Sequence, residues 1–382
     1  MQDAADDAAP PDDAPLMAAA LAQARRGRPS PEPPEGFILA RADGTLIAEG
    51  FRADAEGTSV VLDALAALGA AAQGTTLYAT LEPNNAEEAG VVDGILAAGV
   101  KRVVIGSLYP ESTGRGGGAD RLRDAGLVVD MSMPFGAEAR TLIAPWVKHA
   151  TTGLPHVALK LALSLDGRIA SRSGASKWVT GTEARVKVQQ LRSMHDGVAV
   201  GIGTALSDDP RLTVRDAALL PEDGQPPVRI IFDTKLRLPR SAHVVDTASD
   251  VPTWVFGGEG APDEAEAALV DAGCRVHRVP LTAEGRVDLV SAFTILAADG
   301  IVSVLVEGGA ELAGTLLAGQ LADELHAFLA PILLGPRGRP GAVDWAGPET
   351  PTDAPRVVEP TWEVCGHDAY VHGRLAYPEP ED

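Results

Sequence analysis

Short apolar runs alternate with helix-forming segments through the second half of the chain, and this alternation limits the fold more than any other feature of the sequence. Strands that alternate with helices indicate a mostly parallel sheet with helices packed on it. The end of the chain differs, because three consecutive strand-like runs have no helix between them, which favours an antiparallel sheet edge. The expected strands lie at 156–162, 197–201, 229–232, 253–256, 275–279, 302–306, 324–334, 356–364 and 369–375, and the expected helices at 183–193, 263–272 and 310–318.

The first half predicts a second set of α/β layers. The dipeptide Asp43-Gly44 lies between two apolar runs, which is typical of a hairpin turn. Helices are expected at 16–26, at 60–68 and before Gly99, and strands at 37–40, 46–48, 76–80, 102–106 and 127–131.

The breaker Gly153-Leu-Pro155 marks the boundary between the two halves. Both ends of the chain are rich in acidic residues, alanine or proline and have little to bury, so we expect them to be disordered. The prediction is a tail at 1–14, a first domain at 15–134, a linking helix at 135–154, a second domain at 155–376 and a tail at 377–382.

The charge of the chain excludes one class of partner. Among 382 residues, 53 are acidic and 32 are lysine or arginine, which gives a formal net charge of −21. Such a field repels phosphate backbones, so nucleic acid is not an expected partner. An anionic small substrate must then be held by local arginine or lysine side chains.

Cysteine content and hydropathy exclude further classes of protein. The two cysteines, Cys274 and Cys365, are too few for a disulfide framework or a four-cysteine zinc site. No apolar run approaches the roughly 20 residues of a membrane helix. The N-terminal segment is acidic, where a signal peptide is basic. The expectation is a cytoplasmic protein that does not contact membranes.

Two glycine turns follow predicted strands in the second half. They are Gly201-Ile-Gly203-Thr204 and Glu307-Gly308-Gly309, the second of which opens a helix. Turns of this kind can receive phosphate at a helix N-terminus, although tight packing alone also selects glycine there. A third segment, Thr180-Gly-Thr-Glu183, fits a capping box at a helix start.

Lys160 and Asp166 are the two charged residues of this half that need an explanation. Lys160 interrupts an apolar strand, where a charge is costly unless it faces a site or a partner. Asp166, in Ser-Leu-Asp-Gly, is typical of a turn.

Several motifs of the second half occur together in one known family. They are Lys160 with Asp166-Gly-Arg, Ser176-Lys-Trp178, Gly201-Ile-Gly-Thr204, Asp208-Asp-Pro-Arg-Leu-Thr-Val-Arg215 and Glu307-Gly-Gly309. In this order, from about 155 to 375, they resemble the reductase domain of the bifunctional deaminase-reductase family of riboflavin biosynthesis. The resemblance implies a dihydrofolate-reductase-like mixed sheet. It also implies reduction of 5-amino-6-(5-phosphoribosylamino)uracil, with NADPH giving hydride to the opened ribose.

The resemblance also implies the roles of individual residues. Lys160, Asp208 and Glu307 would surround the reacting ribose as catalytic groups, with Lys160 polarising or protonating it. Ser176, Arg192, Leu212 and Arg215 would hold the substrate, the arginines suiting its phosphate. Trp178, Thr204, Thr234, Gly309, Gly314 and Thr315 would hold NADPH.

The first half resembles the zinc deaminase domain of the same family, but without its chemistry. Zinc deaminases use one histidine and two cysteines as ligands and a glutamate as proton shuttle. The histidine and glutamate positions hold Ser59 and Val61, and the cysteine positions hold Asn84 and a residue near Val91. Where the family has a substrate-binding asparagine between two prolines, this chain has Glu32. We expect no metal, no deaminase activity and a structural role for this half.

Two other readings stay open from the sequence. The reductase fold could act on another pyrimidine- or pterin-like compound, although Arg192 and Arg215 favour a phosphorylated substrate. Alternatively, the chain could be a non-catalytic partner of the pathway, against which the intact Lys160, Asp208 and Glu307 count. A homodimer is the expected assembly in either case.

Overall fold

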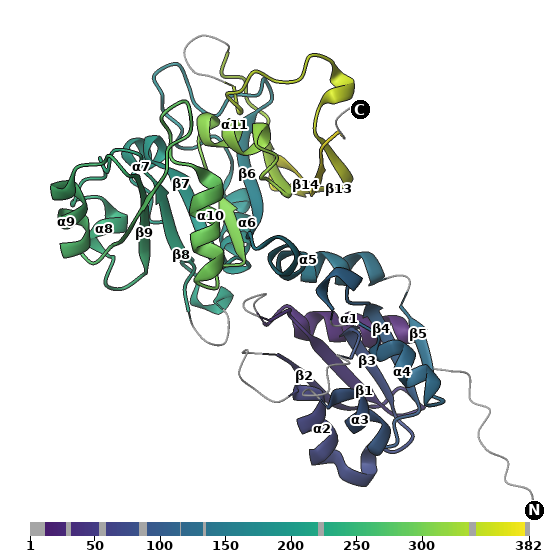
Figure 1. The fold of residues 1–382 in the computed structure, drawn as a ribbon. Helices are drawn as coiled ribbons and strands as arrows, with labels where there is room; N and C mark the ends of the chain where they lie inside the picture. The colour runs from purple at the N-terminus through teal and green to yellow at the C-terminus, as the bar shows by residue number, and fades with distance from the viewer. Residues whose placement is uncertain are drawn as a thin grey trace, which may run out of the picture. The chain divides into compact units, whose positions relative to one another are not determined.

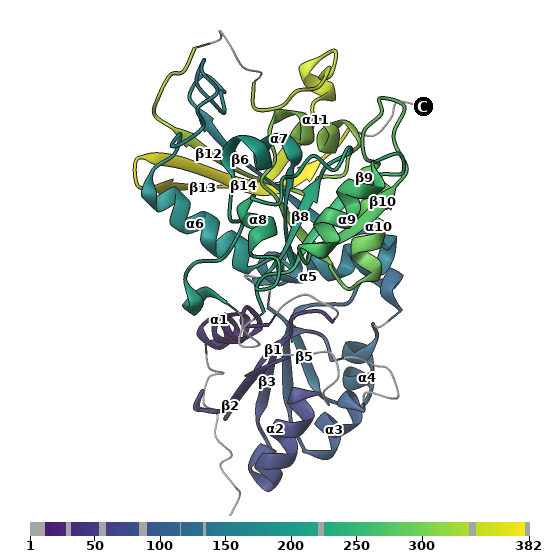
Figure 2. The same ribbon diagram turned by 90° about the vertical axis from the view of Figure 1, so that its left-hand side faces the viewer.

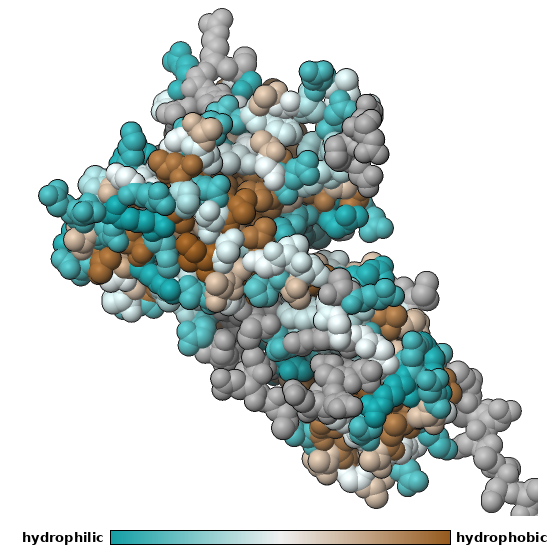
Figure 3. Space-filling model, in the orientation of Figure 1, coloured by the Kyte–Doolittle hydropathy of each residue, from teal (hydrophilic) through white to brown (hydrophobic). Residues whose placement is uncertain are grey.

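The structure is a computed structural model, and it describes residues 12–27, 32–52, 59–83, 90–114, 116–132, 135–220, 225–335 and 341–378. The chain divides into two compact units, one that ends at Gly153 and one that begins at Leu154. Both are α/β, as the sequence predicts (Figure 1). No helix among these residues has the length and apolar character needed to cross a membrane. Hydrophilic side chains cover much of the face in Figure 3, with smaller apolar patches between them.

The first unit is a three-layer arrangement around a five-stranded sheet of order β2-β1-β3-β4-β5. One face packs against α2, α3 and α4 through a core that includes Leu65, Ile95 and Leu122. The opposite face packs against α1 and α5 through Met17, Leu21 and Ala139. The elements are α1 (Asp13–Ala24), β1 (Gly36–Ala40), β2 (Leu46–Phe51), α2 (Val60–Leu68), β3 (Thr76–Leu81), α3 (Val91–Ala97), β4 (Arg102–Ser107), α4 (Gly118–Asp124), β5 (Val128–Met131) and α5 (Gly136–Thr152).

The predicted hairpin forms as expected. Strands β1 and β2 pair antiparallel, and Gly44 adopts a positive φ of 83°. The Asp43 carboxylate accepts the main-chain N–H of Thr45 at 2.9 Å, and this closes the turn. The other neighbours, β3 with β4 and β4 with β5, are parallel.

The sequence-based boundaries need three corrections. The predicted tail at 1–14 is helical from Asp13, and the Asp12 side chain caps that helix. The predicted linking helix belongs to the first unit, because α5 buries Ala139, Ile143 and Trp146 against it. At the other end, the Tyr377 hydroxyl donates to the Ala322 carbonyl, so the second unit extends past 376. Residues 1–11 and 379–382 lie outside the described residues.

The second unit is built on a nine-stranded sheet of order β10-β9-β8-β7-β11-β6-β12-β14-β13. Figure 2 shows β12 and β13 on the left of this unit and β9 and β10 on its right. The strands from β10 to β12 are parallel, and β14 and β13 complete an antiparallel edge, as predicted. The strands are β6 (His156–Ser164), β7 (Gly197–Gly201), β8 (Val228–Phe232), β9 (Thr253–Gly258), β10 (Arg275–Val279), β11 (Ser303–Val306), β12 (Glu324–Ala330), β13 (Arg356–Cys365) and β14 (Asp368–Ala376).

Helices cover both faces of this sheet. On one face, α10 and α11 pack over Phe232, Phe256 and Val306. On the other, α7, α8 and α9 pack over Val200 and Ile231, and α6 packs over the β6–β12–β14 side. The helices are α6 (Thr182–Ser193), α7 (Ile202–Asp208), α8 (His243–Asp246), α9 (Asp263–Asp271), α10 (Leu289–Ala298) and α11 (Ala310–Ala318).

The sequence analysis missed three of these helices, α7, α10 and the four-residue α8. The residues of α7 were interpreted as part of a glycine-rich turn, since Gly201 and Gly203 flank its start. The residues of α10 are apolar on most sides and give little helical periodicity. The Asp288 side chain, which accepts the N–H of Ser291 at 2.6 Å, was its available start signal.

Candidate active site

A cavity of about 420 Å³ opens in the second unit beyond the carboxyl ends of β7 and β8. Ligands of open α/β sheets bind at this edge, where strand-to-helix turns present main-chain groups. The glycine turn at 201–203 forms one wall, and the start of α11 forms another. Of the sequence-predicted site residues, Ser176, Thr204, Asp208, Thr234, Gly309 and Thr315 line this cavity.

The start of α11 contributes a wall without a side chain. Gly309 is its N-cap, and a Cβ atom placed there would stand 3.3 Å from the Thr204 hydroxyl. A side chain at Gly203 would enter open space. Glycine at both positions therefore leaves main-chain N–H groups accessible, as phosphate binding at a helix N-terminus requires.

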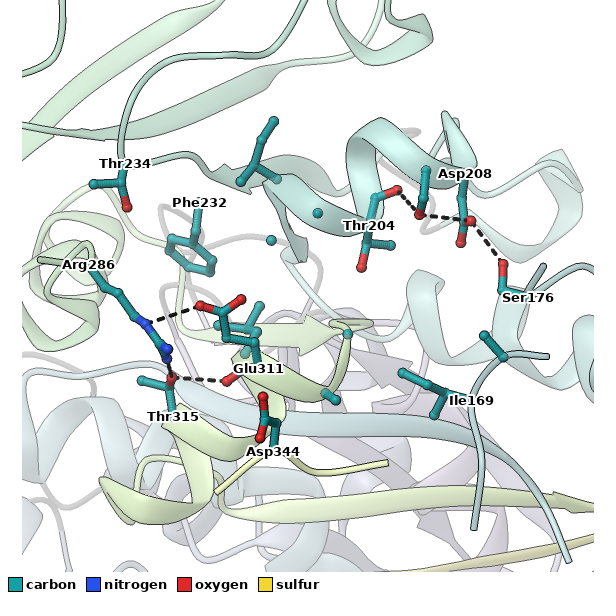
Figure 4. Close-up of a pocket in the computed structure, with 18 of the residues that line it drawn as sticks. Ile169, Ser176, Thr204, Asp208, Phe232, Thr234, Arg286, Glu311, Thr315 and Asp344 are labelled. Atoms are coloured by element: carbon teal, nitrogen blue, oxygen red, sulfur yellow. Dashed lines mark hydrogen bonds and ion pairs between the residues drawn. The ribbon is translucent and has the colours of Figure 1, made fainter. Parts of the chain in front are cut away.

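Gly314, which the resemblance assigns to NADPH binding, has a packing role in the structure. It is absent from the cavity wall, and a Cβ atom there would collide with the main-chain carbonyl of Asp344. It is a close-packing glycine that lets the segment at Asp344 lie against α11. Asp344 itself reaches the cavity (Figure 4).

Arg286 is a cavity residue that the sequence analysis missed. Its Nε lies 3.1 Å from the Glu311 carboxylate, and its Nη1 lies 3.4 Å from the Thr315 hydroxyl. Figure 4 shows Arg286 and Glu311 side by side on one wall. Because the Arg286 side chain is half exposed, it can leave Glu311 for an anion at little cost. No motif in the sequence marks this arginine.

Ser176 and Asp208 face each other at the other end of the cavity (Figure 4). The Ser176 hydroxyl donates to the Asp208 carboxylate at 2.9 Å, and the Ser207 hydroxyl donates to the same oxygen at 3.0 Å. The Lys177 ammonium holds the Asp208 main-chain carbonyl at 2.9 Å. The loop before α6 is thus fastened to the end of α7.

A buried ionic cluster made by Lys160, Glu307 and Arg192 lies on the α6 side of the sheet. The Arg192 guanidinium binds the Glu307 carboxylate in a fork, at 2.6 Å and 3.1 Å, and its Nη1 donates to the Thr213 carbonyl at 2.9 Å. The Lys160 Nζ lies 3.9 Å from Glu307. Since Arg192 is occupied by Glu307, its inferred contact with a substrate phosphate would need this fork to open.

Burial governs the protonation of this cluster. Burial lowers the pKa of Lys160, Arg192 adds to the effect, and Glu307 and Asp208 oppose it. Burial alone would raise the pKa of Glu307, but Arg192 and then Lys160 outweigh it and lower that pKa overall. Glu307 therefore stays anionic, while the Lys160 ammonium gives up its proton more readily than an exposed lysine. A lysine of this kind suits proton transfer.

The remaining predicted residues lie around these groups. Arg215 is exposed and acts on the charge of Glu307. Leu212 has a positive φ of 52°, and its side chain packs in the core with Val198. Trp178 is 66% exposed, and the Arg185 guanidinium stacks over its ring.

Of the two predictions about turns, one is wrong and the other is confirmed. The capping box is wrong, because α6 begins at Thr182 with Gly181 as its N-cap and no side-chain cap bond. Asp368 instead accepts the N–H of Gly181 at 2.7 Å. Asp166 does lie in the turn after β6, and its carboxylate accepts the N–H groups of Leu334 and Gly335. It thereby fastens the loop that follows β12.

At the deaminase positions that the structure describes, the first unit holds no comparable group. Ser59 is the N-cap of α2 and makes no side-chain cap bond, and Val61 lies in its first turn. Val91 is buried at the start of α3. Asn84 lies outside the described residues, and Glu32 lies just before β1. Residues 1–148 contain neither histidine nor cysteine.

Residues 155–371 match the family model described as the RibD C-terminal domain. The chain belongs to the RibD family. It is 34% identical to the riboflavin biosynthesis protein RibD of Bacillus amyloliquefaciens, over 88% of this chain and 89% of that relative. The RibD of Escherichia coli (strain K12) is 34% identical over 93% of this chain and 97% of the relative.

Solved RibD structures resemble both units. Acinetobacter baumannii RibD (form 1) has a TM-score of 0.77 and 31% identity, with 96% of this chain and 99% of that chain covered. A Thermotoga maritima diaminohydroxyphosphoribosylaminopyrimidine deaminase/5-amino-6-(5-phosphoribosylamino)uracil reductase has a TM-score of 0.77 and 29% identity, with 95% and 98% covered. The predicted family and two-domain α/β fold are confirmed, and the RibD likeness includes the first unit.

Proposed function

We propose that this RibD family member is an NADPH-dependent reductase of 5-amino-6-(5-phosphoribosylamino)uracil. The observation that carries the proposal is the buried Lys160–Glu307–Arg192 cluster on a RibD reductase domain. The charge of Asp208, on the wall of the glycine-lined cavity, acts on Lys160. A proton donor and a cofactor-sized cavity therefore share one edge of the sheet.

NADPH fits the residues of the cavity. Gly203 and Gly309 leave main-chain groups open to its phosphates, and Arg286 supplies a partly exposed guanidinium. Thr204, Thr234 and Thr315 add hydroxyl groups along the wall. When bound, NADPH supplies the hydride, and the protein orients it toward the ribose carbon of the substrate.

The substrate is assigned to the α6 side, near Lys160. Arg215 is exposed and unlike Arg192 is not held in a carboxylate fork, so it is the better ligand for the substrate phosphate. Ser176 presents its hydroxyl beside Asp208. Because the Leu212 side chain is in the core, that residue would contact substrate only through its main chain. Lys160 would protonate the nitrogen that joins the opened ribose to the pyrimidine, since that nitrogen gains the electron pair of the C=N bond when C1′ is reduced.

The first unit is proposed to be inactive as a deaminase. Activation of water in these enzymes needs a zinc ion held by histidine and cysteine. Residues 1–148 contain neither residue type, and Val61 cannot shuttle protons. The unit would act as a scaffold, and the deamination would be done by another protein.

A homodimer through the β13 edge is also proposed. Trp362 and Val364 are 66% and 86% exposed, and both lie on this edge strand, whose outer main-chain groups are available for pairing. The variant Trp362→Glu/Val364→Lys should elute as a monomer in size-exclusion chromatography with light scattering. A wild-type monomer at micromolar concentration would contradict the dimer.

The function is tested by the near-ultraviolet absorbance of NADPH when 5-amino-6-(5-phosphoribosylamino)uracil is added. The proposal expects the absorbance to fall with the wild type. If NADPH binds but no absorbance is lost, another pyrimidine- or pterin-like substrate is the better reading. If NADPH does not bind either, the chain is a non-catalytic partner.

A further inference from the structure

A second polar cluster of the second unit takes no part in the proposed reduction. It consists of Glu324 and His326 on β12 and His372 on β14. The Glu324 and His326 side chains share a face, since they are two residues apart on one strand. His372 is the register partner of His326 across the two strands, so all three side chains meet on the face covered by α6.

The distances in this cluster suit a metal ion better than direct hydrogen bonds. The His326 Nε2 and the His372 Nδ1 lie 3.5 Å and 3.8 Å from the same Glu324 oxygen. A direct N–H···O bond is about 2.9 Å long. Ligand atoms around a tetrahedral Zn²⁺, at bond lengths near 2.0–2.1 Å, lie about 3.4 Å apart. Small movements would therefore bring all three atoms into coordination.

The other nitrogen of each histidine also has a partner. The His326 Nδ1 lies 2.7 Å from the Tyr370 hydroxyl, and the His372 Nε2 lies 3.6 Å from the Glu363 carboxylate. In metal sites, the ring nitrogen that does not bind the ion usually donates to a group of this kind, which fixes the ring and the tautomer. The cluster thus has both a ligand set and the shell that orients it.

The surroundings point to the same class of ion. His156 and His195 act on the charge of Glu324 together with His326 and His372, so half of the eight histidines of the chain gather here. Imidazole and carboxylate ligands favour zinc and its neighbours over magnesium or calcium. The His372 side chain is 28% exposed, which gives an ion a way in, whereas His326 is buried.

We propose that Glu324, His326 and His372 form a site for a divalent transition metal ion, zinc above all, with water completing the coordination. The ion would join β12 to β14, one strand away from Lys160, which is the other register partner of His326. The role is structural. The site also lies in the other unit from the deaminase positions, for which the sequence predicts no zinc.

The test uses the full-length chain, freed of any affinity tag and treated with a chelator. Co²⁺ is the spectroscopic probe and Zn²⁺ the competitor. The wild type should bind one Co²⁺ per chain, with visible d–d absorption that Zn²⁺ abolishes. His372→Gln and Glu324→Gln should lose this absorption. His367→Gln, an exposed residue of the same hairpin, should keep it.

Glu363→Gln keeps the proposal testable if the ligand variants fail to fold. Its side chain is 42% exposed and lies outside the ligand set, so the fold should persist while the affinity for Zn²⁺ falls about ten-fold or more. The proposal is overturned if the wild type shows no such absorption. It is equally overturned if the ligand variants, folded by circular dichroism, bind as the wild type does.

Discussion

The two units differ in where they keep their charges. In the first unit the ion pairs of the described residues are partly exposed, as where Arg102 joins Asp13 and Asp130 between α1 and the sheet, and the buried Glu82 carboxylate accepts main-chain N–H groups. In the second, Lys160, Glu307 and Arg192, with side chains 17%, 11% and 9% exposed, lie together at a sheet edge that also opens a cavity. Exposed pairs contribute little to stability, whereas a largely buried cluster of charges is costly, and such clusters are often found at functional sites. Within one α/β chain, a largely buried cluster of opposite charges therefore separates the unit assigned to catalysis from the unit assigned to support.

The largest expected effect falls on Lys160. Lys160→Ala should lower kcat/KM by about 10²–10⁴, the range for losing a general acid, because no other described group takes its position beside Glu307. Steady-state NADPH oxidation measures it. Lys101→Ala, at an exposed lysine of the first unit, is the matched control and should be unchanged. Equal losses in both variants would erase the distinction between the units.

Stability tests the comparison directly. Arg192→Met removes the guanidinium fork from the largely buried Glu307 carboxylate and leaves the Lys160 Nζ 3.9 Å away, so the free energy of unfolding should fall by about 3–5 kcal/mol. Arg102→Met, in the first unit, should cost about 1 kcal/mol, since its partners are partly exposed. Urea unfolding followed by circular dichroism gives both values. A larger loss of unfolding free energy for Arg102→Met than for Arg192→Met would contradict the difference between the two units.

Arg286 sharpens the account of the cavity. Arg286→Ala should raise the KM for NADPH about ten-fold, with a smaller change in kcat, because one charge-assisted hydrogen bond to a phosphate is lost. Arg275→Ala removes an arginine of β10 that has similar exposure and pairs with Asp299, the residue that follows α10. That control should bind NADPH normally. An unchanged KM in Arg286→Ala would remove Arg286 from the cofactor site.

The smallest expected effect is on the pH profile. Because burial lowers the pKa of Lys160 below its usual 10.5, the protonated acid is lost as pH rises through that lowered value. The alkaline limb of kcat should therefore begin below pH 10.5, and Lys160→Arg should shift it upward along with a lower rate. A wild-type profile that stays flat to pH 10.5 would argue that Lys160 donates no proton.

The sequence predicted those features of the fold that depend on the pattern of neighbouring residues. Strand order along the chain, the Asp43-Gly44 hairpin and the helix after Gly309 all follow from nearby residues. The pairing of Arg192 with Glu307 does not, because the two are far apart in sequence and meet only through the stacking of α6 on the sheet. The capping box failed for a similar reason, since Asp368 of β14 supplies the partner for Gly181.

Sites that form only when two strands pair in one register could not be predicted from the sequence either. His326 and His372 meet because β12 and β14 pair in one register, which neither segment shows by itself. Arg286 reaches the cavity from a segment with no motif, and only the position of Glu311 on α11 explains its orientation. Leu212, chosen by family resemblance, turned out to pack its side chain in the core.

The most direct test of the account offers the full chain two substrates in parallel, with NADPH absorbance and released ammonia both measured. One is 5-amino-6-(5-phosphoribosylamino)uracil, and the other is its undeaminated diaminopyrimidine precursor. The account predicts NADPH oxidation with the first and no ammonia from the second. Ammonia release from the precursor would contradict the inactive first unit, and the absence of NADPH oxidation with the uracil would contradict the reductase.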